Sequence, residues 1–331
     1  MGKTIAVIGS GSWGTGISHL LGRAGNQVKL WSFDEGSDTY INENHKNPLY
    51  LTDVELPNVW CSREYSEVLE GVEGVVVVTP SVVMRTTANG IKPFIGEDTP
   101  VVVLSKGVEE ATGFQMAEVL ADVLGNPGRI AAMCGPNHAE EVSKDLPAAT
   151  VVAARDENTA KFFQDLFTTD VFRVYTSTDV TGVELCSAAK NIIAIANGML
   201  CEMGLGDSAS ASLITRGLAE MTRLVVAMGG NEKTCMGLAG MGDLVVTCTS
   251  KHSRNRTLGT MLVNGGTLAE FEAKTKMVAE GAVACKTVTA LADKHGVDMP
   301  IAQMVRRVLW ENLDPRDAVV ELLSRPTKPE F

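Results

Sequence analysis

Side chains that can exchange a proton or bind an anion gather at three places along the chain. Lys106 directly follows a valine-rich run, and Lys190 lies in a stretch whose apolar residues repeat at helical spacing. Asp243 follows two glycines that flank Met241, and three cations then fall within residues 251–256. Because the chain has 29 Lys and Arg against 40 Asp and Glu, a formal net charge of -11, this basic cluster is unexpected. It is either a solvated turn or a binding site for an anion.

The surroundings of Lys190 predict a buried lysine. Residues 183–200 contain no proline and are apolar on most sides of a helix. Polar residues follow one stripe of that helix, namely Glu184, Ser187, Lys190, Asn191 and Asn197. A buried ammonium group needs a partner or a lowered pKa. The alternatives are a lysine at the rim of a helical bundle and, for Lys106, a simple surface position at the end of its strand.

A glycine-rich turn near the N-terminus predicts a dinucleotide-binding site. Residues 5–8 form a short β-branched run, and GSGSWG follows it directly. Gly9 permits the tight turn, Gly11 lets a pyrophosphate approach the backbone, and Gly14 lets the next helix pack on the strand. That helix offers free N–H groups and a partial positive charge to the phosphates. A plain glycine turn is the alternative, but the strand–turn–helix–strand order favours the nucleotide site.

Further strand-like runs place this turn in a doubly wound sheet, and helices follow the sheet. The runs lie at residues 28–31, 74–79, 100–105, 129–134, 149–154 and 171–175. Continuous apolar runs suit a parallel sheet that binds ligands at the carboxyl ends of its strands. Polar segments at those ends are residues 79–81, 105–107 and 134–138.

After about residue 178 the pattern becomes helical. The longest stretches are 183–200 and 208–228, the second with an expected Arg216–Glu220 ion pair one turn apart. Shorter helical patterns lie at 267–275, 280–294, 299–312 and 315–323. We therefore expect an α/β fold, with an N-terminal Rossmann-like doubly wound sheet over residues 1–178 and an all-helical C-terminal domain over residues 179–331.

Composition excludes several classes of protein. The acidic balance and the aromatic content of 5% argue against a nucleic-acid binder, which needs cationic surface and stacking platforms. No apolar stretch is long enough for a membrane span, and the N-terminus leaves no room for a signal peptide. The Cys and His residues follow no metal-ligand spacing, so we expect no metal and small, buried, reduced cysteines. The expectation is a cytoplasmic protein that acts on a small molecule.

Several short segments appear in a characteristic order: S-K-G at residues 105–107, G-P at 135–136, A-K-N at 189–191, G-x-G-D at 240–243 and S-R-N at 253–255. Together they closely resemble the NAD(P)-dependent glycerol-3-phosphate dehydrogenases of the bacterial type, over residues 5–313. The resemblance implies a Rossmann-like domain followed by helices, NAD or possibly NADP as cofactor, and a homodimer. It also implies reversible hydride transfer between NAD(P)H and dihydroxyacetone phosphate, which gives sn-glycerol 3-phosphate for glycerophospholipid synthesis.

The resemblance implies roles for Lys106, Lys190, Asp243 and the basic cluster. Lys190 falls on the catalytic acid/base, and Lys106 and Asp243 fall in the same catalytic site. A lysine with its ordinary pKa of about 10.4 is a poor base at neutral pH. Burial and the second cation Lys106 would lower that pKa toward ~7–8, while Asp243 holds the ammonium in position. The basic cluster becomes a phosphate clamp formed by residues 253–255.

The same resemblance assigns contacts to both ligands. Substrate contacts fall on Lys106, Gly135, Asn137, Lys190, Asp243, Ser253, Arg254 and Asn255. Cofactor contacts fall on Gly9, Gly11, Ser12, Trp13, Gly14, Phe33, Asp34, Lys106, Ala139, Arg254, Val278 and Glu280. One departure concerns residues 137–138, where this chain has Asn-His and the family commonly has Ser-Phe. Asparagine keeps a polar side chain for the substrate contact.

The end of the second strand predicts a preference for NAD over NADP. Asp34 lies twenty residues beyond Gly14, where a carboxylate accepts a hydrogen bond from the ribose 2′-OH and repels a 2′-phosphate. Many bacterial members carry Arg or His where this chain has Phe33, so this position lacks the cation that favours NADP.

Two other functions fit part of the sequence. A related dehydrogenase acting on another small hydroxy acid or sugar acid would share the glycine turn and a buried lysine, but would not need the clamp at residues 253–255. A protein that only senses NAD would have no use for Lys106 and Lys190 together. Turnover of dihydroxyacetone phosphate distinguishes both from the dehydrogenase.

Overall fold

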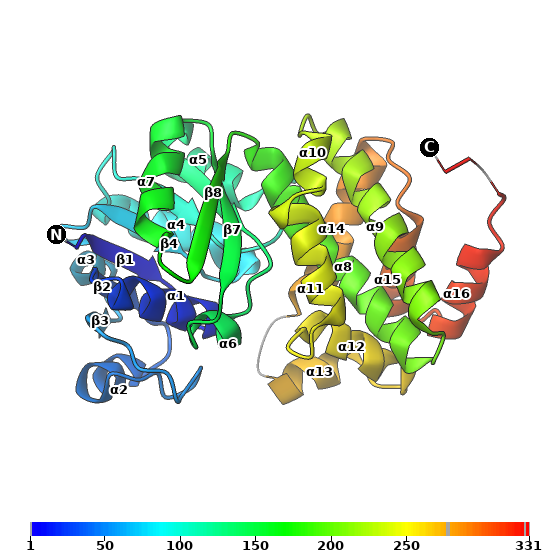
Figure 1. The fold of residues 1–331 in the computed structure, drawn as a ribbon, viewed down its shortest axis with the longest axis horizontal. Helices are drawn as coiled ribbons and strands as arrows, with labels where there is room; N and C mark the ends of the chain where they lie inside the picture. The colour runs from blue at the N-terminus through cyan, green and yellow to red at the C-terminus, as the bar shows by residue number, and fades with distance from the viewer. Residues whose placement is uncertain (1, 276–278, 328, 331) are drawn as a thin grey trace.

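An eight-stranded sheet forms the N-terminal part of the molecule, on the left of Figure 1. The computed structural model describes residues 2–275, 279–327 and 329–330. The strands are β1 Thr4–Ile8, β2 Gln27–Trp31, β3 Val59–Ser62, β4 Gly74–Val77, β5 Val101–Val103, β6 Ile130–Cys134, β7 Ala148–Ala154 and β8 Phe172–Ser177. They lie in the order β3-β2-β1-β4-β5-β6-β7-β8. The order reverses between β1 and β4, where a doubly wound sheet opens a crevice for its ligand.

Neighbouring strands run parallel, as the valine-rich runs predict, except at one pair. β6 and β7 are antiparallel, with Ala132 opposite Ala153. The connection between them contains a single short helix, α6 (Ala139–Val142), which does not provide the long crossover that a parallel partner requires. The sheet is therefore mostly parallel, with one antiparallel pair. The strand-like runs of the sequence do not include β3, an edge strand of four residues.

Helices cover both faces of the sheet. They are α1 Ser12–Arg23, α2 Ser37–Asn44, α3 Tyr65–Leu69, α4 Met84–Ile91, α5 Met116–Leu124 and α7 Glu157–Phe167, with 3₁₀ turns at Ser81–Val83, Lys92–Phe94 and Pro127–Arg129. Ile5 and Val7 of β1 join the apolar core on the α1 and α7 side, while Ala6 and Ile8 join the core on the α4 and α5 side. Because alternate residues of a strand point to opposite faces, a strand buried on both faces has no polar positions.

Helix α8 (Val180–Glu202) lies at the centre of the C-terminal part, with other helices packed around it (Figure 1). These are α9 Asp207–Ala227, α10 Glu232–Cys235, α11 Asp243–Thr249, α12 Arg254–Val263, α13 Leu268–Thr275, α14 Glu280–Lys294, α15 Pro300–Trp310 and α16 Pro315–Leu323. α8 and α12 approach closely, since a Cβ at Gly198 would lie 2.1 Å from the carbonyl oxygen of Arg256. This approach holds the first turn of α12 against the helix that carries Lys190.

The two longest helical patterns of the sequence form α8 and α9, but one expected contact is not formed among the described residues. Glu220 does not pair with Arg216. Its side chain is 2% exposed and accepts hydrogen bonds from the N–H groups of Ile301 and Ala302, at 2.8 and 3.2 Å. The first N–H groups of a helix have no partner within that helix, so a buried carboxylate satisfies them.

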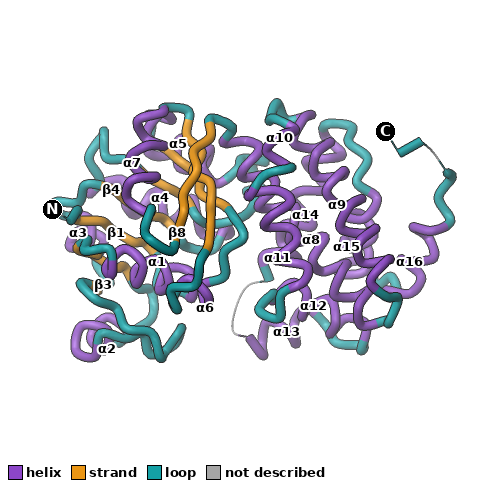
Figure 2. Tube along the Cα trace, viewed as in Figure 1, coloured by secondary structure: helices purple, strands orange, loops and turns teal. Residues whose placement is uncertain are grey.

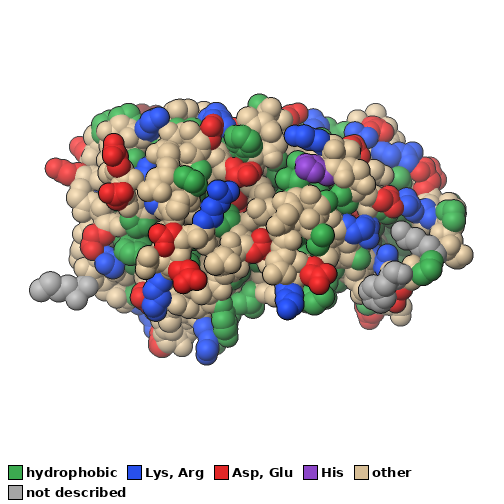
Figure 3. Space-filling view, turned by 90° about the horizontal axis from the view of Figure 1, so that it is seen from above, with side chains coloured by type: hydrophobic (Ala, Val, Ile, Leu, Met, Phe, Trp, Pro, Cys, Tyr) green, Lys and Arg blue, Asp and Glu red, His purple; other side chains and the backbone are tan. Residues whose placement is uncertain are grey.

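Strands and helices separate along the molecule. In Figure 2 the strands lie in the N-terminal half, and the other half consists of helices and connecting loops. No helix in the described part of the chain is long and apolar enough to cross a membrane. On the face shown in Figure 3, Lys and Arg side chains are interspersed with Asp and Glu. That face therefore presents mixed charge to its surroundings.

Candidate active site

Lys106, Lys190 and Asp243 meet where the sheet contacts the helical part. Asp243 begins α11 and is 1% exposed, and Lys190 lies in the middle of α8 and is 3% exposed. Lys190 Nζ donates to Asp243 Oδ1, and Lys106 Nζ donates to Asp243 Oδ2 at 3.1 Å. Each carboxylate oxygen thus faces one ammonium group. Lys190 is not at the rim of the bundle, and Lys106 is not an isolated surface side chain.

The backbone before α11 directs Asp243 toward α8. A π-helical turn, η4 (Leu238–Gly242), leads into α11, and a Cβ at Gly240 would lie 2.0 Å from the carbonyl oxygen of Cys235. One turn into α11, the Thr247 hydroxyl accepts from Lys190 Nζ at 2.6 Å and donates to the carbonyl oxygen of Asp243 at 2.6 Å. Two residues on one face of α11 therefore hold the ammonium of Lys190.

The three charges set one another's pKa values. Burial lowers the pKa of Lys190 to about 8, and the charge of Lys106 adds to this shift while Asp243 opposes it. Burial also opposes the charge of Lys106, but Asp243 raises the pKa of Lys106 above its ordinary value. Burial works against ionisation of Asp243, and the two lysines nevertheless hold its pKa below the ordinary value. Near neutral pH, Lys190 can therefore both hold and release a proton, while its neighbours stay charged.

The predicted clamp lies at the first turn of α12. Ser253 is 4% exposed and caps the helix, because its Oγ accepts from the N–H of Arg256 at 3.2 Å. Arg254 is the first residue of the helix. The partial positive charge of a helix N-terminus disfavours a cation there and favours an anion. A guanidinium and a helix N-terminus at one place suit a phosphate group.

A hydrogen-bonded chain connects the clamp to the neighbour of Lys190. Asn255 Nδ2 donates to Asn191 Oδ1 at 3.0 Å. Asn255 Oδ1 accepts from the N–H of Gly281 in α14 at 3.1 Å. These bonds fix the clamp relative to both α8 and α14.

The glycine turn has the geometry that a dinucleotide requires. Gly9 has a φ of 120°, which side chains disfavour, and a Cβ at Gly14 would lie 1.8 Å from the carbonyl oxygen of Gly9. A Cβ at Gly11 would meet nothing within 4 Å, so the space in front of it is open to a ligand. Among the described residues, no side chain caps the first turn of α1, which carries Ser12 and Trp13. The residues present fit a bound pyrophosphate.

Two other predicted cofactor residues each begin a helix. Ala139 begins α6 and is 7% exposed. Glu280 begins α14 and accepts from Ser81 Oγ at 3.2 Å, which joins the turn after β4 to the helical part. Burial raises the pKa of Glu280, and the charges of Arg254 and Lys106 oppose that rise. Val278 lies outside the described residues.

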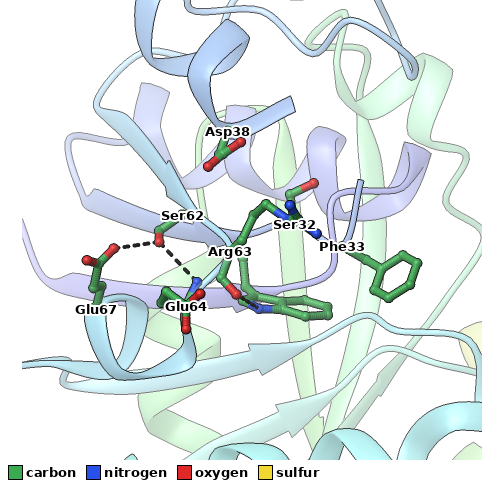
Figure 4. Close-up of a pocket in the computed structure, with 8 residues that line it drawn as sticks. Ser32, Phe33, Asp38, Ser62, Arg63, Glu64 and Glu67 are labelled. Carbon is green, nitrogen blue, oxygen red and sulfur yellow. Dashed lines mark hydrogen bonds between the residues drawn. The ribbon is translucent and has the colours of Figure 1, made fainter. Parts of the chain in front are cut away.

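A pocket of about 550 Å³ opens at the ends of β2 and β3 (Figure 4). Its lining residues are Trp31, Ser32, Phe33, Asp38, Ser62, Arg63, Glu64 and Glu67. Phe33 is 76% exposed. The N–H of Asp34 donates to Ser32 Oγ at 3.3 Å, which places Asp34 beside the pocket. Arg63 brings a cation to the same pocket from the end of β3, a residue that the sequence analysis did not consider.

The loop after β6 carries the departure from the family pattern. A Cβ at Gly135 would lie 2.7 Å from the backbone of β7, so the loop passes close to that strand. Asn137 Nδ2 donates to the carbonyl oxygen of Ala149 at 3.0 Å. His138 faces His252, with ring centroids 5.8 Å apart, and burial lowers the pKa of His138. A neutral imidazole therefore lies beside the loop that precedes the clamp.

Sequence reasoning missed two contacts of the central cluster. Thr247 follows Asp243 by one helical turn, and this spacing would have identified it. Cys134 Sγ donates to Asp243 Oδ2 at 3.1 Å, and nothing in the sequence alone pairs these residues. The expectation that the cysteines act as buried hydrophobes is incomplete for Cys134 and wrong for Cys201, which is exposed.

A glycine turn that fits a pyrophosphate, a lysine of near-neutral pKa and a predicted anion clamp together indicate a class of protein, the two-domain nicotinamide-dependent dehydrogenases. Comparison with known proteins gives the family. A model described as the N-terminus of NAD-dependent glycerol-3-phosphate dehydrogenase matches residues 4–160, and a model of its C-terminus matches residues 179–320. The chain belongs to this family of oxidoreductases.

Relatives cover nearly the whole chain. A glycerol-3-phosphate dehydrogenase named for NAD(P)+ from Streptomyces griseus is 47% identical over 327 residues, covering 98% of this chain and 97% of that protein. Its counterpart from Corynebacterium urealyticum is 44% identical over 330 residues, covering 98% and 99%. The crystal structure of glycerol-3-phosphate dehydrogenase from Coxiella burnetii matches with a TM-score of 0.93 and 39% identity, covering 98% and 99%. The predicted family and fold class are confirmed.

Proposed function

We propose that this protein reduces dihydroxyacetone phosphate reversibly to sn-glycerol 3-phosphate with NADH or NADPH, for glycerophospholipid synthesis. The observation that carries the proposal is the bond from Asn255 to Asn191 at 3.0 Å, which fixes an anion clamp beside the Lys190–Asp243–Lys106 cluster. A phosphate site this close to an acid/base suits a short phosphorylated substrate. The relatives named above support the same activity.

The clamp binds and orients the substrate in this proposal. The Arg254 guanidinium offers a planar fork of donors to the phosphate oxygens, and the first turn of α12 adds its N–H groups. Ser253 and Asn255 hold that turn in place. Gly135 and Asn137 line the substrate from the loop after β6.

Proton transfer falls to Lys190. When bound, the nicotinamide cofactor supplies a hydride to the carbonyl carbon in reduction or accepts it in oxidation. Lys190 gives its proton to the substrate oxygen in reduction and takes the hydroxyl proton back in oxidation. Lys106 keeps its charge and stabilises negative charge that develops on that oxygen. Asp243 holds both ammonium groups in position.

The proposal divides the chain at residue 178. Residues 1–178 hold the nucleotide through Gly9, Gly11, Ser12, Trp13 and Gly14, with Phe33, Asp34, Lys106 and Ala139 as further contacts from this part. Residues 179–331 supply most of the catalytic and substrate residues, namely Lys190, Asp243, Ser253, Arg254 and Asn255, and also Arg254, Val278 and Glu280 as cofactor contacts. Lys106, Gly135 and Asn137 reach the substrate from the N-terminal part.

A cytoplasmic homodimer is also part of the proposal. Several apolar side chains of the helical part are exposed and available for a second copy, including Met236 at 71%, Val320 at 64% and Leu323 at 82%. Sedimentation analysis of the purified chain distinguishes a dimer from a monomer.

The decisive experiment measures NADH consumption with dihydroxyacetone phosphate, and repeats it with NADPH. The proposal requires turnover with at least one cofactor and formation of glycerol 3-phosphate. Turnover of unphosphorylated keto acids in preference to dihydroxyacetone phosphate would instead favour the related dehydrogenase. Tight NADH binding without any turnover would favour a sensing protein.

A further inference from the structure

Cys134 is a buried thiol in direct contact with the central carboxylate. It ends β6, is 4% exposed, and donates to Asp243 Oδ2 at 3.1 Å. The next acceptor, the carbonyl oxygen of Ala239, lies 4.0 Å from the sulfur. The short contact is therefore the one to the oxygen that also accepts from Lys106.

The thiol completes the set of donors around the carboxylate of Asp243. Oδ1 lies against Lys190 Nζ, with the Thr247 hydroxyl at 3.3 Å, and Oδ2 accepts from Lys106 Nζ and Cys134 Sγ, both at 3.1 Å. A carboxylate has about four lone-pair sites, two on each oxygen. The single proton of Thr247 goes to the carbonyl oxygen of Asp243 at 2.6 Å, so Oδ1 accepts mainly from one ammonium, whereas Oδ2 accepts from one ammonium and from the thiol.

The thiol stays protonated, and so remains a donor. Burial raises the pKa of Cys134 to about 11, and Asp243 adds to the rise. The charged groups that face it are Asp243 of α11, Lys106 after β5 and Lys190 of α8, while Ser187 of α8 offers a polar contact. At neutral pH Cys134 is therefore neither a thiolate nor a nucleophile.

We propose that Cys134 is a positioning residue for the reaction, because its S–H bond holds the Asp243 carboxylate in the orientation that gives Oδ1 to Lys190 and Oδ2 to Lys106. Without this donor, less of the carboxylate charge is neutralised at Oδ2, and only the two ammonium groups hold the orientation of the carboxylate. Lys190 then faces a stronger negative charge and retains its proton to higher pH. The inference rests on the proposed dehydrogenase activity.

Three variants test the inference: Cys134→Ala, Cys134→Ser and Cys285→Ala. Cys285 of α14 is a matched control, since it is fully buried and its thiol donates to the carbonyl oxygen of Ala302 in α15 at 3.4 Å. We expect Cys134→Ala to lose about tenfold in kcat, the lower end of what a hydrogen bond to a charged group contributes. In the pH profile of kcat/KM for glycerol 3-phosphate oxidation, the acidic limb should move to higher pH. NADH binding should be retained. Cys134→Ser keeps a donor and should restore both kcat and the pH limb.

Two outcomes overturn the inference. One is an equal loss in Cys134→Ala and Cys285→Ala with no movement of the pH limb, which would make Cys134 a packing residue. The other is a Cys134→Ser variant that behaves like Cys134→Ala. If the unaltered protein turns over neither substrate, the proposed function fails, and the side-chain ¹³C resonance of Lys190 still compares its pKa among the variants. An unchanged Lys190 pKa in Cys134→Ala would then refute the positioning role separately.

Discussion

Lys190 experiences two opposing influences, burial that disfavours its charge and a carboxylate that favours it. Burial prevails and brings its pKa to about 8, with help from Lys106. Sequence reasoning foresaw the direction of this shift, because the helix around Lys190 is apolar on most sides. It did not foresee that Thr247 and Cys134 complete the shell around Asp243, since these contacts depend on how distant segments pack.

Replacing Lys190 removes the proposed acid/base. We expect Lys190→Ala to lower kcat by the ~10²–10⁴ typical of general acid–base catalysis. NADH binding should persist, because the glycine turn is untouched. Steady-state kinetics and NADH fluorescence measure the two effects, with the exposed Lys161 of α7 replaced by Ala as control. A Lys190→Ala enzyme that retains a tenth of the kcat contradicts the assigned role.

The pKa of Lys190 also predicts opposite pH dependences for the two directions. Oxidation of glycerol 3-phosphate needs neutral Lys190, so its kcat/KM should rise with pH and level off above about 8. Reduction of dihydroxyacetone phosphate needs the protonated form, so its kcat/KM should fall above about 8. Profiles measured in both directions check this expectation. If kcat/KM changed with pH in the same sense for both directions, a group other than Lys190 would transfer the proton.

Replacing Arg254 tests whether this side chain binds the substrate or the cofactor. A hydrogen bond to a charged group contributes about 1.5–3 kcal/mol. Arg254→Ala should therefore reduce kcat/KM for dihydroxyacetone phosphate by roughly ten- to a hundredfold. Part of the loss can fall on kcat, because phosphate binding orients the carbonyl. Unphosphorylated dihydroxyacetone, a poor substrate that does not use the clamp, is the control at saturating NADH. If kcat/KM fell by the same factor for both substrates, Arg254 would instead bind the cofactor or stabilise the fold.

At the scale of elements, periodic apolar patterns identified the long helices but not the short ones around the site. α8 and α9 have long repeats, whereas α11 and α12 contain polar residues such as Thr247 and Asn255 that contact other side chains of the site. Polar residues on the inward face of a helix interrupt the regular spacing of apolar residues by which a helix is recognised in a sequence. β6 and β7 show the same limit, because a run of buried apolar residues does not specify strand direction.

The residues at the ends of β2 and β3 predict which cofactor the protein prefers. Asp34 beside the pocket and Asp38 within it oppose a 2′-phosphate, while Phe33 supplies no cation. We therefore expect a higher kcat/KM with NADH than with NADPH, and a shift toward NADPH in Phe33→Arg. Arg63→Ala should weaken use of NADPH more than use of NADH, since Arg63 is a cation in the same pocket. Equal or better use of NADPH by the unaltered enzyme would refute the preference.

At the scale of the whole molecule, the site exists because the two parts of the chain share one core and several polar contacts. Lys106 comes from the sheet, and Lys190 and Asp243 come from the helices. Local patterns predicted the element that carries each residue, but not their meeting, because no local rule relates segments so far apart. The family resemblance supplied that information. Where it did not reach, as at Cys134 and Arg63, the residues were found only in the folded structure.

Glu184 also connects the two parts. Its raised pKa predicts how the free energy of unfolding depends on pH. It lies in α8 and accepts from the N–H of Ala117 in α5 at 2.9 Å, while its Oε2 has no hydrogen-bond partner among the described residues. Burial raises its pKa from 4.5 to about 8. The folded state therefore holds a proton that the unfolded state releases. Stability from this group is complete below about pH 4.5 and is lost as pH rises toward about 8.

Glu184→Gln should remove this dependence, because the amide keeps the acceptor and has no charge to bury. Between pH 5.5 and pH 7.5, the free energy of unfolding of the variant should gain about 2.5 kcal/mol relative to the unaltered protein, from slightly less than one proton over two pH units. Urea denaturation at these pH values gives the difference, and the shared core should make each transition cooperative. Glu220→Gln is a matched comparison, and it should gain stability in the same direction over this pH range but by a smaller amount. Its carboxyl also caps a helix, and burial raises its pKa to about 7, but both partners lie within the helical part. An identical pH slope for Glu184→Gln and the unaltered protein would mean that Glu184 is ionised in the fold, with the α5 N-terminus compensating its burial.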